Sequence, residues 1–310
     1  MPGWPGSLLI VVGGLVAVVA LGAIEMVRRG DLDADVRVLG LELLLGAIAF
    51  VIGLVYVAIR QIRMRRVLPP ERYRGPSVFI LLGLALVTAA VLTAPFTADA
   101  LALQTGDGVV SPLGSAVILV AAQVGLLVVG YLFVYRPRAL AALPAFAGRD
   151  PRAAIIAGLG WGVLAWIGSS VVLILVAALL TALGQPPPVG PAEQAIAMLD
   201  PLLVVVSIVI VAPLVEELFF RGIVFNAWRR EAGRLPAYVG SAALFAAIHL
   251  SLVSLLPIFL LGLALAWVYE RTGSLLAAIV MHATVNGISV AVALAVRFGM
   301  VDVPVSVIGW

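Results

Sequence analysis

Long apolar runs separated by short polar segments dominate the sequence. A helix needs about 20 apolar residues to cross the hydrocarbon of a bilayer, which is roughly 30 Å thick. Runs of about that length or more recur along the chain, and we expect each to form a membrane span: Ser7–Val27, Val38–Ile59, Ser77–Pro95, Leu113–Tyr135, Ala153–Leu183, Pro201–Trp228 and Ser274–Val296. The pattern therefore predicts helices that cross a membrane repeatedly.

A further apolar stretch, Ala237–Tyr269, is too long for one span and short for two. As one helix it would be about 50 Å long, which exceeds the thickness of the hydrocarbon. Ser251, Ser254 and Pro257 lie near its middle and predict a break there. We therefore expect an all-α fold, a polytopic transmembrane helical bundle with eight or nine membrane segments.

Composition supports a membrane protein, because 63% of the 310 residues are apolar and only 11% are charged. Soluble domains have about 25% charged residues. The absence of cysteine excludes disulfides and thiolate metal sites. The Ala/Val/Gly-rich, lysine-free composition is typical of a GC-rich prokaryote, so we expect a multi-pass protein of a prokaryotic plasma membrane, with the lipid bilayer as its surroundings.

The arginines lie in short loops between apolar runs, which argues against a nucleic-acid-binding patch. Basic residues mark cytoplasmic loops of membrane proteins. They gather in 60–74, 136–152 and 229–234, whereas the intervening loops 96–112 and 184–200 contain none. This alternation predicts a cytoplasmic N-terminus.

We divide the chain into N-terminal transmembrane helices, residues 1–150, and a C-terminal domain, residues 151–300. The N-terminal helices carry no candidate site, and their role is not indicated by their residues. All candidate chemistry lies in the C-terminal domain.

Both histidines of the chain, His249 and His282, lie in apolar stretches downstream of the pair Glu216-Glu217. An ionisable side chain at the middle of a bilayer costs about 2.5–3.5 kcal/mol on insertion scales, so several of them together indicate function. Glu217 and Arg221 are four residues apart and can pair on one helical face. Such an ion pair leaves Glu216 available as a general base.

His282 and Asn286 are also four residues apart, so that an imidazole N–H and an amide could both stabilise an oxyanion. The alternative is a polar contact between helices, a common use of His and Asn in membranes. Counted along their segments, Glu216, His249, His282 and Asn286 all lie roughly 14–20 Å from the predicted cytoplasmic ends. This shared depth favours a single site.

The motifs EExxxR, FxxxH and HxxxN follow one another within residues 200–290. This ordered set resembles the CPBP family of intramembrane proteases, which includes the type II CAAX prenyl endopeptidases and Abi-type enzymes. The resemblance implies a helical bundle around a conical cavity and hydrolysis of a peptide bond in a membrane-associated protein or peptide substrate. It also implies roles for six residues: water activation by Glu216 with His249, shaping and neutralisation of the site by Glu217 and Arg221, and oxyanion stabilisation by His282 and Asn286.

A metalloprotease is the alternative mechanism, with a zinc ion held by Glu216, His249 and His282. That arrangement would need another base, yet Glu217 is expected to pair with Arg221, and the chain has no HExxH motif. We therefore favour a metal-free mechanism and infer no firm cofactor.

Two other functions are compatible with the same residues. A non-catalytic membrane scaffold or bacteriocin-immunity protein could retain the fold and its motifs. A transporter or proton relay would also use buried Glu and His. Against transport, no inverted repeat is evident, and the polar residues form a cluster and not a path across the membrane.

Overall fold

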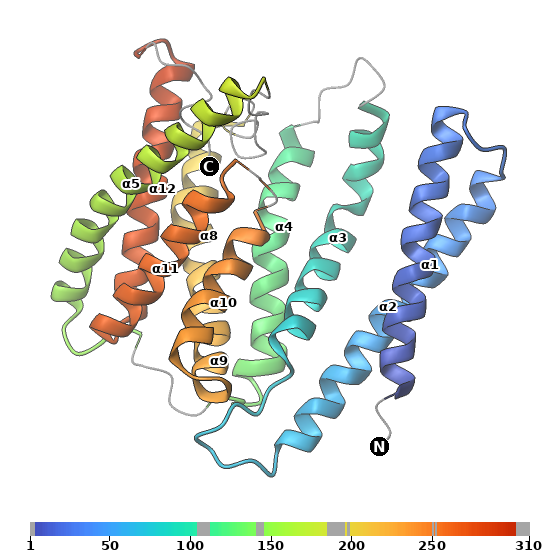
Figure 1. The fold of residues 1–310 in the computed structure, drawn as a ribbon, viewed down its shortest axis with the longest axis horizontal. Helices are drawn as coiled ribbons and strands as arrows, with labels where there is room; N and C mark the ends of the chain where they lie inside the picture. The colour runs from blue at the N-terminus through green and yellow to red at the C-terminus, as the bar shows by residue number, and fades with distance from the viewer. Residues whose placement is uncertain are drawn as a thin grey trace.

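The computed structural model describes residues 4–103, 112–140, 146–184, 196, 199–249, 251 and 253–301. Within these ranges every regular element is helical, and the helices run side by side as a bundle (Figure 1). Six of the described helices are long and apolar enough to cross a membrane, and two further apolar helices are shorter. The expected all-α, polytopic bundle is confirmed.

The N-terminal half begins with a helical hairpin at the edge of the bundle (Figure 1). A Cβ atom on Gly13 would lie 2.7 Å from the carbonyl oxygen of Gly46, so these glycines allow the two helices to approach closely. Many other side chains of the hairpin are exposed and apolar, as expected of a surface that faces lipid. The helices of this half are α1 (Trp4–Arg29), α2 (Val36–Arg65), α3 (Val78–Leu103), and α4 (Pro112–Gly130) with its π-helical continuation η1 (Tyr131–Tyr135). Helix α5 (Pro151–Ala182) begins the C-terminal half.

The span predicted at Pro201–Trp228 is one continuous helical run that is interrupted twice by wider π-helical turns. Pro213 lies just after the first of them, and its missing N–H removes a regular backbone hydrogen bond. Such π-helical turns often occur at functional sites. The run consists of α7 (Pro201–Val204), η2 (Val205–Val211), α8 (Ala212–Phe219), η3 (Phe220–Phe225) and α9 (Asn226–Glu231).

The predicted break within Ala237–Tyr269 is confirmed. Helix α10 (Arg234–Ala247) ends before it and α11 (Leu255–Thr272) begins after it. Gly273 then adopts φ +62°, a left-handed conformation that suits glycine and ends α11. Ser274 caps the next helix, α12 (Leu275–Arg297), by accepting a hydrogen bond from the backbone of Ala277.

Many of the fully buried side chains belong to α8, η3, α10, α11 and α12. Phe220, Phe245 and Leu265 are fully buried where these helices meet. Helices α4 and α5 pack on the outside of this group, and α4 contacts α8. The polar residues of α8 are therefore enclosed in the apolar core of the C-terminal half.

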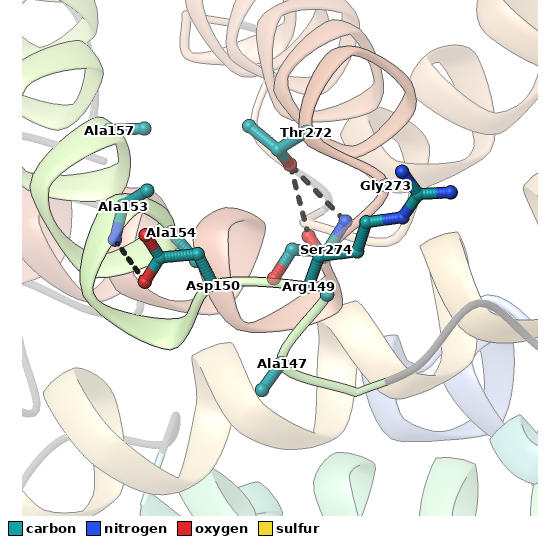
Figure 2. Close-up of a pocket in the computed structure, with 10 residues that line it drawn as sticks. Ala147, Arg149, Asp150, Ala153, Ala154, Ala157, Thr272, Gly273 and Ser274 are labelled. Carbon is teal, nitrogen blue, oxygen red and sulfur yellow. Dashed lines mark hydrogen bonds between the residues drawn. The ribbon is translucent and has the colours of Figure 1, made fainter.

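A cavity of about 570 Å³ lies between the start of α5 and the turn from α11 to α12 (Figure 2). Its lining includes Arg149, Asp150, Thr272 and Ser274. The Asp150 carboxylate accepts hydrogen bonds from the first backbone N–H groups of α5. The lining contains none of the candidate site residues, so this cavity differs from the one that the family resemblance implies around Glu216.

Candidate functional site

A fully buried ion pair lies at the junction of α8 and η3. Arg221 Nη1 donates to Glu217 Oε1 at 2.8 Å, and neither side chain has exposed surface. Arg221 Nη2 also donates to the carbonyl oxygen of Gly262 in α11 at 2.9 Å. The guanidinium carbon lies 4.7 Å from the centre of the Phe245 ring in α10. The predicted pairing is confirmed, and Arg221 joins three segments of the bundle.

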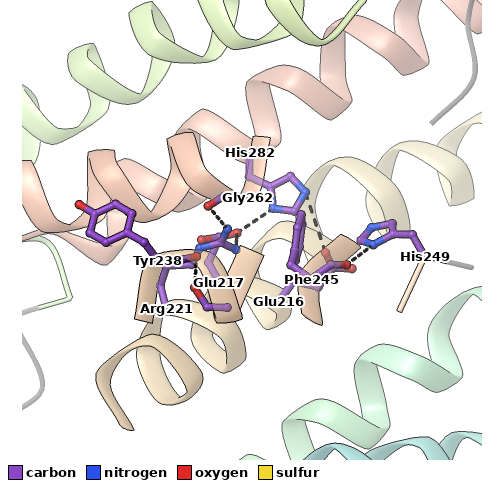
Figure 3. A network of polar contacts seen from close by, with 9 residues as sticks. Glu216, Glu217, Arg221, Tyr238, Phe245, His249, Gly262 and His282 are labelled. Atoms are coloured by element: carbon purple, nitrogen blue, oxygen red, sulfur yellow. Dashed lines mark hydrogen bonds and ion pairs between the residues drawn. The ribbon is translucent and has the colours of Figure 1, made fainter. Parts of the chain in front are cut away.

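His282, on α12, lies between the two glutamates of α8 (Figure 3). Its Nδ1 atom is 3.0 Å from Glu217 Oε1, and its Nε2 atom is 3.9 Å from Glu216 Oε2. The shorter contact is a hydrogen bond in which Nδ1–H donates, whereas 3.9 Å is too long for one. The sequence gives no reason to expect the contact with Glu217, because the two residues are far apart in the chain.

Glu216 is buried, with 8% of its surface exposed, and its Oε2 atom has no hydrogen-bond partner within the described chain. A buried carboxylate without a partner is costly, so this oxygen is suited to bind a polar group that enters the site. The Arg221 guanidinium is hydrogen-bonded to the neighbouring carboxylate, Glu217. The His282 Nε2 atom lies 3.9 Å from Glu216 Oε2.

His249 is half-buried at the end of α10. Its Nδ1 atom lies 2.7 Å from the carbonyl oxygen of Phe245, which assigns the ring proton to Nδ1 and leaves Nε2 as an acceptor. The Phe245 ring lies 4.9 Å from the His249 ring and 5.6 Å from the His282 ring. Figure 3 shows the two imidazoles on either side of Phe245. Phe245 thus separates the two histidines. The motif FxxxH, which contains Phe245, did not predict this role.

Asn286 lies one turn beyond His282 on α12, as expected, but its amide is engaged elsewhere. Asn286 Nδ2 donates to the carbonyl oxygen of Ile208, in η2, at 2.9 Å. This contact corresponds to the interhelical alternative considered for Asn286. One N–H of the amide remains for an additional acceptor.

The three residues considered as zinc ligands do not form one ligand group here. Within the described ranges, no cluster of three or more His, Asp or Glu side chains is placed to hold a metal ion. Glu216 and His282 approach each other, and Glu217 orients the imidazole in the way that carboxylates hydrogen-bonded to a metal-binding histidine do. His249 is not part of that group, so the donors present do not fit a three-residue zinc site.

Two residues outside the predicted set contact the backbone of the glutamate helix. Tyr135, from η1, donates its hydroxyl proton to the carbonyl oxygen of Leu218 at 2.7 Å. Asn226 Nδ2 donates to the carbonyl oxygen of Arg221 at 2.7 Å and lies 2.8 Å from the Tyr269 hydroxyl. The sequence carries no motif for these contacts, because they depend on the π-helical turns and on how the helices pack.

Comparison with known proteins identifies the same part of the chain. Residues 198–288 match the family described as type II CAAX prenyl endopeptidase Rce1-like. The UPF0177 protein YxdF of Lactococcus lactis subsp. lactis (strain IL1403) is 32% identical over 78 residues, which cover 25% of this chain and 42% of that relative. No solved structure matches the chain. The match to the Rce1-like family covers residues 198–288, less than half of the chain, and is consistent with the CPBP family that the motifs of this segment resemble.

Proposed function

We propose that the protein is an intramembrane endopeptidase that hydrolyses a peptide bond of a membrane-associated protein or peptide, with Glu216 as the base that activates water. The observation that carries this proposal is the unequal environment of two adjacent carboxylates. Glu217 is bonded through Oε1 to both Arg221 and His282, and only its Oε2 is unpaired within the described chain. For Glu216, the buried Oε2 has no hydrogen-bond partner in the described residues, and its contact with His282 is 3.9 Å long. A general base must be free to accept a proton, and Glu216 meets this requirement.

In the proposed reaction, Glu216 takes a proton from a water molecule while the water oxygen attacks the carbonyl carbon of the substrate. The Nε2 atom of His249 is an acceptor and would help to orient that water. The C–N bond then breaks, and the proton on Glu216 passes to the nitrogen of the leaving amine. Each step uses a group that lies in a buried region, where electrostatic interactions are strong.

The negative oxygen of the tetrahedral intermediate would accept hydrogen bonds from His282 Nε2–H and from the remaining N–H of Asn286. For His282 to donate from Nε2 while Nδ1–H binds Glu217, both ring nitrogens must carry a proton. The Glu217 carboxylate accepts the hydrogen bond from Nδ1–H and so orients the ring. This gives Glu217 a function without direct contact to the substrate.

The position of the site supports a substrate that is associated with the membrane. Glu216 and His282 lie within helices long and apolar enough to cross a membrane. A substrate that is already held at the membrane loses less hydration on reaching them than a substrate that comes from water. The CAAX prenyl specificity in the family's description belongs to that family. For this chain we propose a membrane-associated substrate in a prokaryotic plasma membrane, with the N-terminus cytoplasmic.

The test compares membranes of cells that lack the gene and carry either the wild-type protein or Glu216→Gln. New protein N-termini, identified by terminal-peptide mass spectrometry, are expected with the wild type and absent with Glu216→Gln. Glu42→Gln is the matched control, because Glu42 is exposed on α2, away from the site. Identical N-termini in the wild type and Glu216→Gln would refute the proposal and favour the scaffold or immunity function.

A further inference from the structure

A tyrosine hydroxyl group of the N-terminal half donates a hydrogen bond to the backbone of the glutamate helix, α8. Tyr135 is the last residue of η1 and lies outside the residues matched by the family. Its hydroxyl donates to the carbonyl oxygen of Leu218 at 2.7 Å. Leu218 directly follows Glu217 in α8. The hydrogen bond therefore holds the backbone immediately beside the two glutamates.

The same hydroxyl lies against Gly222. A Cβ atom at this position would be only 2.6 Å from the Tyr135 oxygen, closer than real Cβ contacts. Gly222 follows Arg221, the partner of Glu217. Tyr135 thus contacts the turn of helix that spans the ion pair, at Leu218 on one side and at Gly222 on the other.

The surrounding contacts keep the tyrosine in place. A Cβ on Gly130 of α4 would lie 3.0 Å from the Ile223 side chain, so the two helices approach closely here too. Val134 and Ile223 are fully buried in the interface. In a membrane interior, backbone carbonyl groups near a π-helical turn must find partners within the protein. The Tyr135 hydroxyl is such a partner for Leu218.

We propose that Tyr135 is a positioning residue for the proposed active site: it fixes the backbone of α8 and η3 so that Glu216 and Glu217 face His282. This assigns a function to a helix of the N-terminal half. The inference rests on the proposed function for its catalytic effect, but the positional effect can be measured separately. Tyr135 touches the helix backbone and acts through it.

The kinetic test uses Tyr135→Phe, Gly222→Ala and the double variant in detergent or liposomes. The probe is a quenched-fluorescent peptide that spans a cleavage site mapped by the comparison of wild type with Glu216→Gln. We expect Tyr135→Phe to lower kcat about tenfold, which corresponds to about 1.4 kcal/mol, and to leave KM nearly unchanged. Tyr131→Phe is the control, because Tyr131 lies on the same π-helical turn but is exposed.

The double variant separates positioning from a general loss of packing. Gly222→Ala alone is expected to lower kcat more than Tyr135→Phe, since the new methyl group meets the hydroxyl oxygen. Removing that hydroxyl makes room for the methyl group, so the double variant should recover to the level of Tyr135→Phe. Additive losses in the double variant, or an unchanged kcat for Tyr135→Phe, would overturn the proposal.

A second measurement needs no substrate, because the chain contains no cysteine. Glu216→Cys introduces a single thiol in α8, and its rate of modification by methyl methanethiosulfonate reports its position. Adding Tyr135→Phe should change this rate severalfold, whereas the rate at Leu183→Cys, at the exposed end of α5, should not change. An unchanged rate at residue 216 contradicts positioning by Tyr135. If Glu216→Gln retains full cleavage, the proposed function fails, and the thiol rates alone decide the role of Tyr135.

Discussion

His282 and Arg221 bind the same oxygen of Glu217. The imidazole Nδ1 atom lies 3.0 Å from Glu217 Oε1, and the guanidinium Nη1 atom lies 2.8 Å from it. One carboxylate oxygen therefore orients the imidazole and balances the charge of a fully buried arginine. The motif EExxxR suggests only the second of these contacts.

The first prediction concerns the stability contributed by Glu217. Glu217→Gln leaves the Arg221 guanidinium buried without a counter-ion, which typically costs about 3–5 kcal/mol. We expect a clearly lower apparent Tm in detergent. Glu217→Gln combined with Arg221→Met removes both charges and should recover much of that loss. An apparent Tm for Glu217→Gln equal to that of the wild type would mean that the ion pair does not stabilise the fold.

The second prediction separates two roles of Asn286. Asn286→Leu removes the hydrogen bond to the carbonyl oxygen of Ile208 and should lower the free energy of unfolding by about 1 kcal/mol. If the amide also stabilises the oxyanion, kcat should fall by about 100-fold or more. Apparent Tm and kcat are measured on the same preparations. A lower Tm with an unchanged kcat would leave Asn286 as an interhelical contact alone.

The third prediction concerns metal. Because His249 does not join Glu216 and His282 in a ligand group, we expect the purified protein to be active without stoichiometric zinc. Inductively coupled plasma mass spectrometry gives the metal content, and peptide cleavage is measured before and after treatment with a chelator. Stoichiometric zinc whose removal abolishes cleavage, and whose return restores it, would establish the metalloprotease alternative.

The fourth prediction compares two glycines. Gly273 ends α11 with φ +62°, so Gly273→Ala should destabilise the fold by about 1–2 kcal/mol. Gly160 lies in α5 with open space where a Cβ would be, so Gly160→Ala should stabilise the helix by about 0.5–1 kcal/mol. Thermal unfolding of both variants is the measurement. Equal effects of the two substitutions would show that the turn at Gly273 is not held in its left-handed conformation.

The sequence was sufficient to predict the features that depend on neighbouring residues in the chain. Span positions follow from the length of apolar runs, and the break between α10 and α11 follows from Ser251, Ser254 and Pro257. The pairing of Glu217 with Arg221 follows from a spacing of one helical turn. These are local properties, and hydropathy and periodicity report them directly.

The features that were missed depend on contacts between distant helices. Nothing in the local pattern around His282 indicates that it binds Glu217, or that the Asn286 amide reaches the carbonyl oxygen of Ile208. The π-helical turns η2 and η3 were also not predicted, because hydropathy shows only one uniform span there. Pro213 is the one residue that indicates an irregular backbone in this span. Tyr135 was not identified because one hydroxyl in an apolar run does not change the hydropathy pattern.

The attachment of Arg221 to three segments restricts how a polypeptide can gain access to Glu216. Its guanidinium contacts Glu217 on α8, the Gly262 carbonyl on α11 and the Phe245 ring on α10. Separating these helices would leave the Arg221 guanidinium without its partners in the membrane interior. The free-energy cost would be several kcal/mol. If the proposed site takes a membrane-held polypeptide, entry by separation of α8, α10 and α11 is therefore disfavoured.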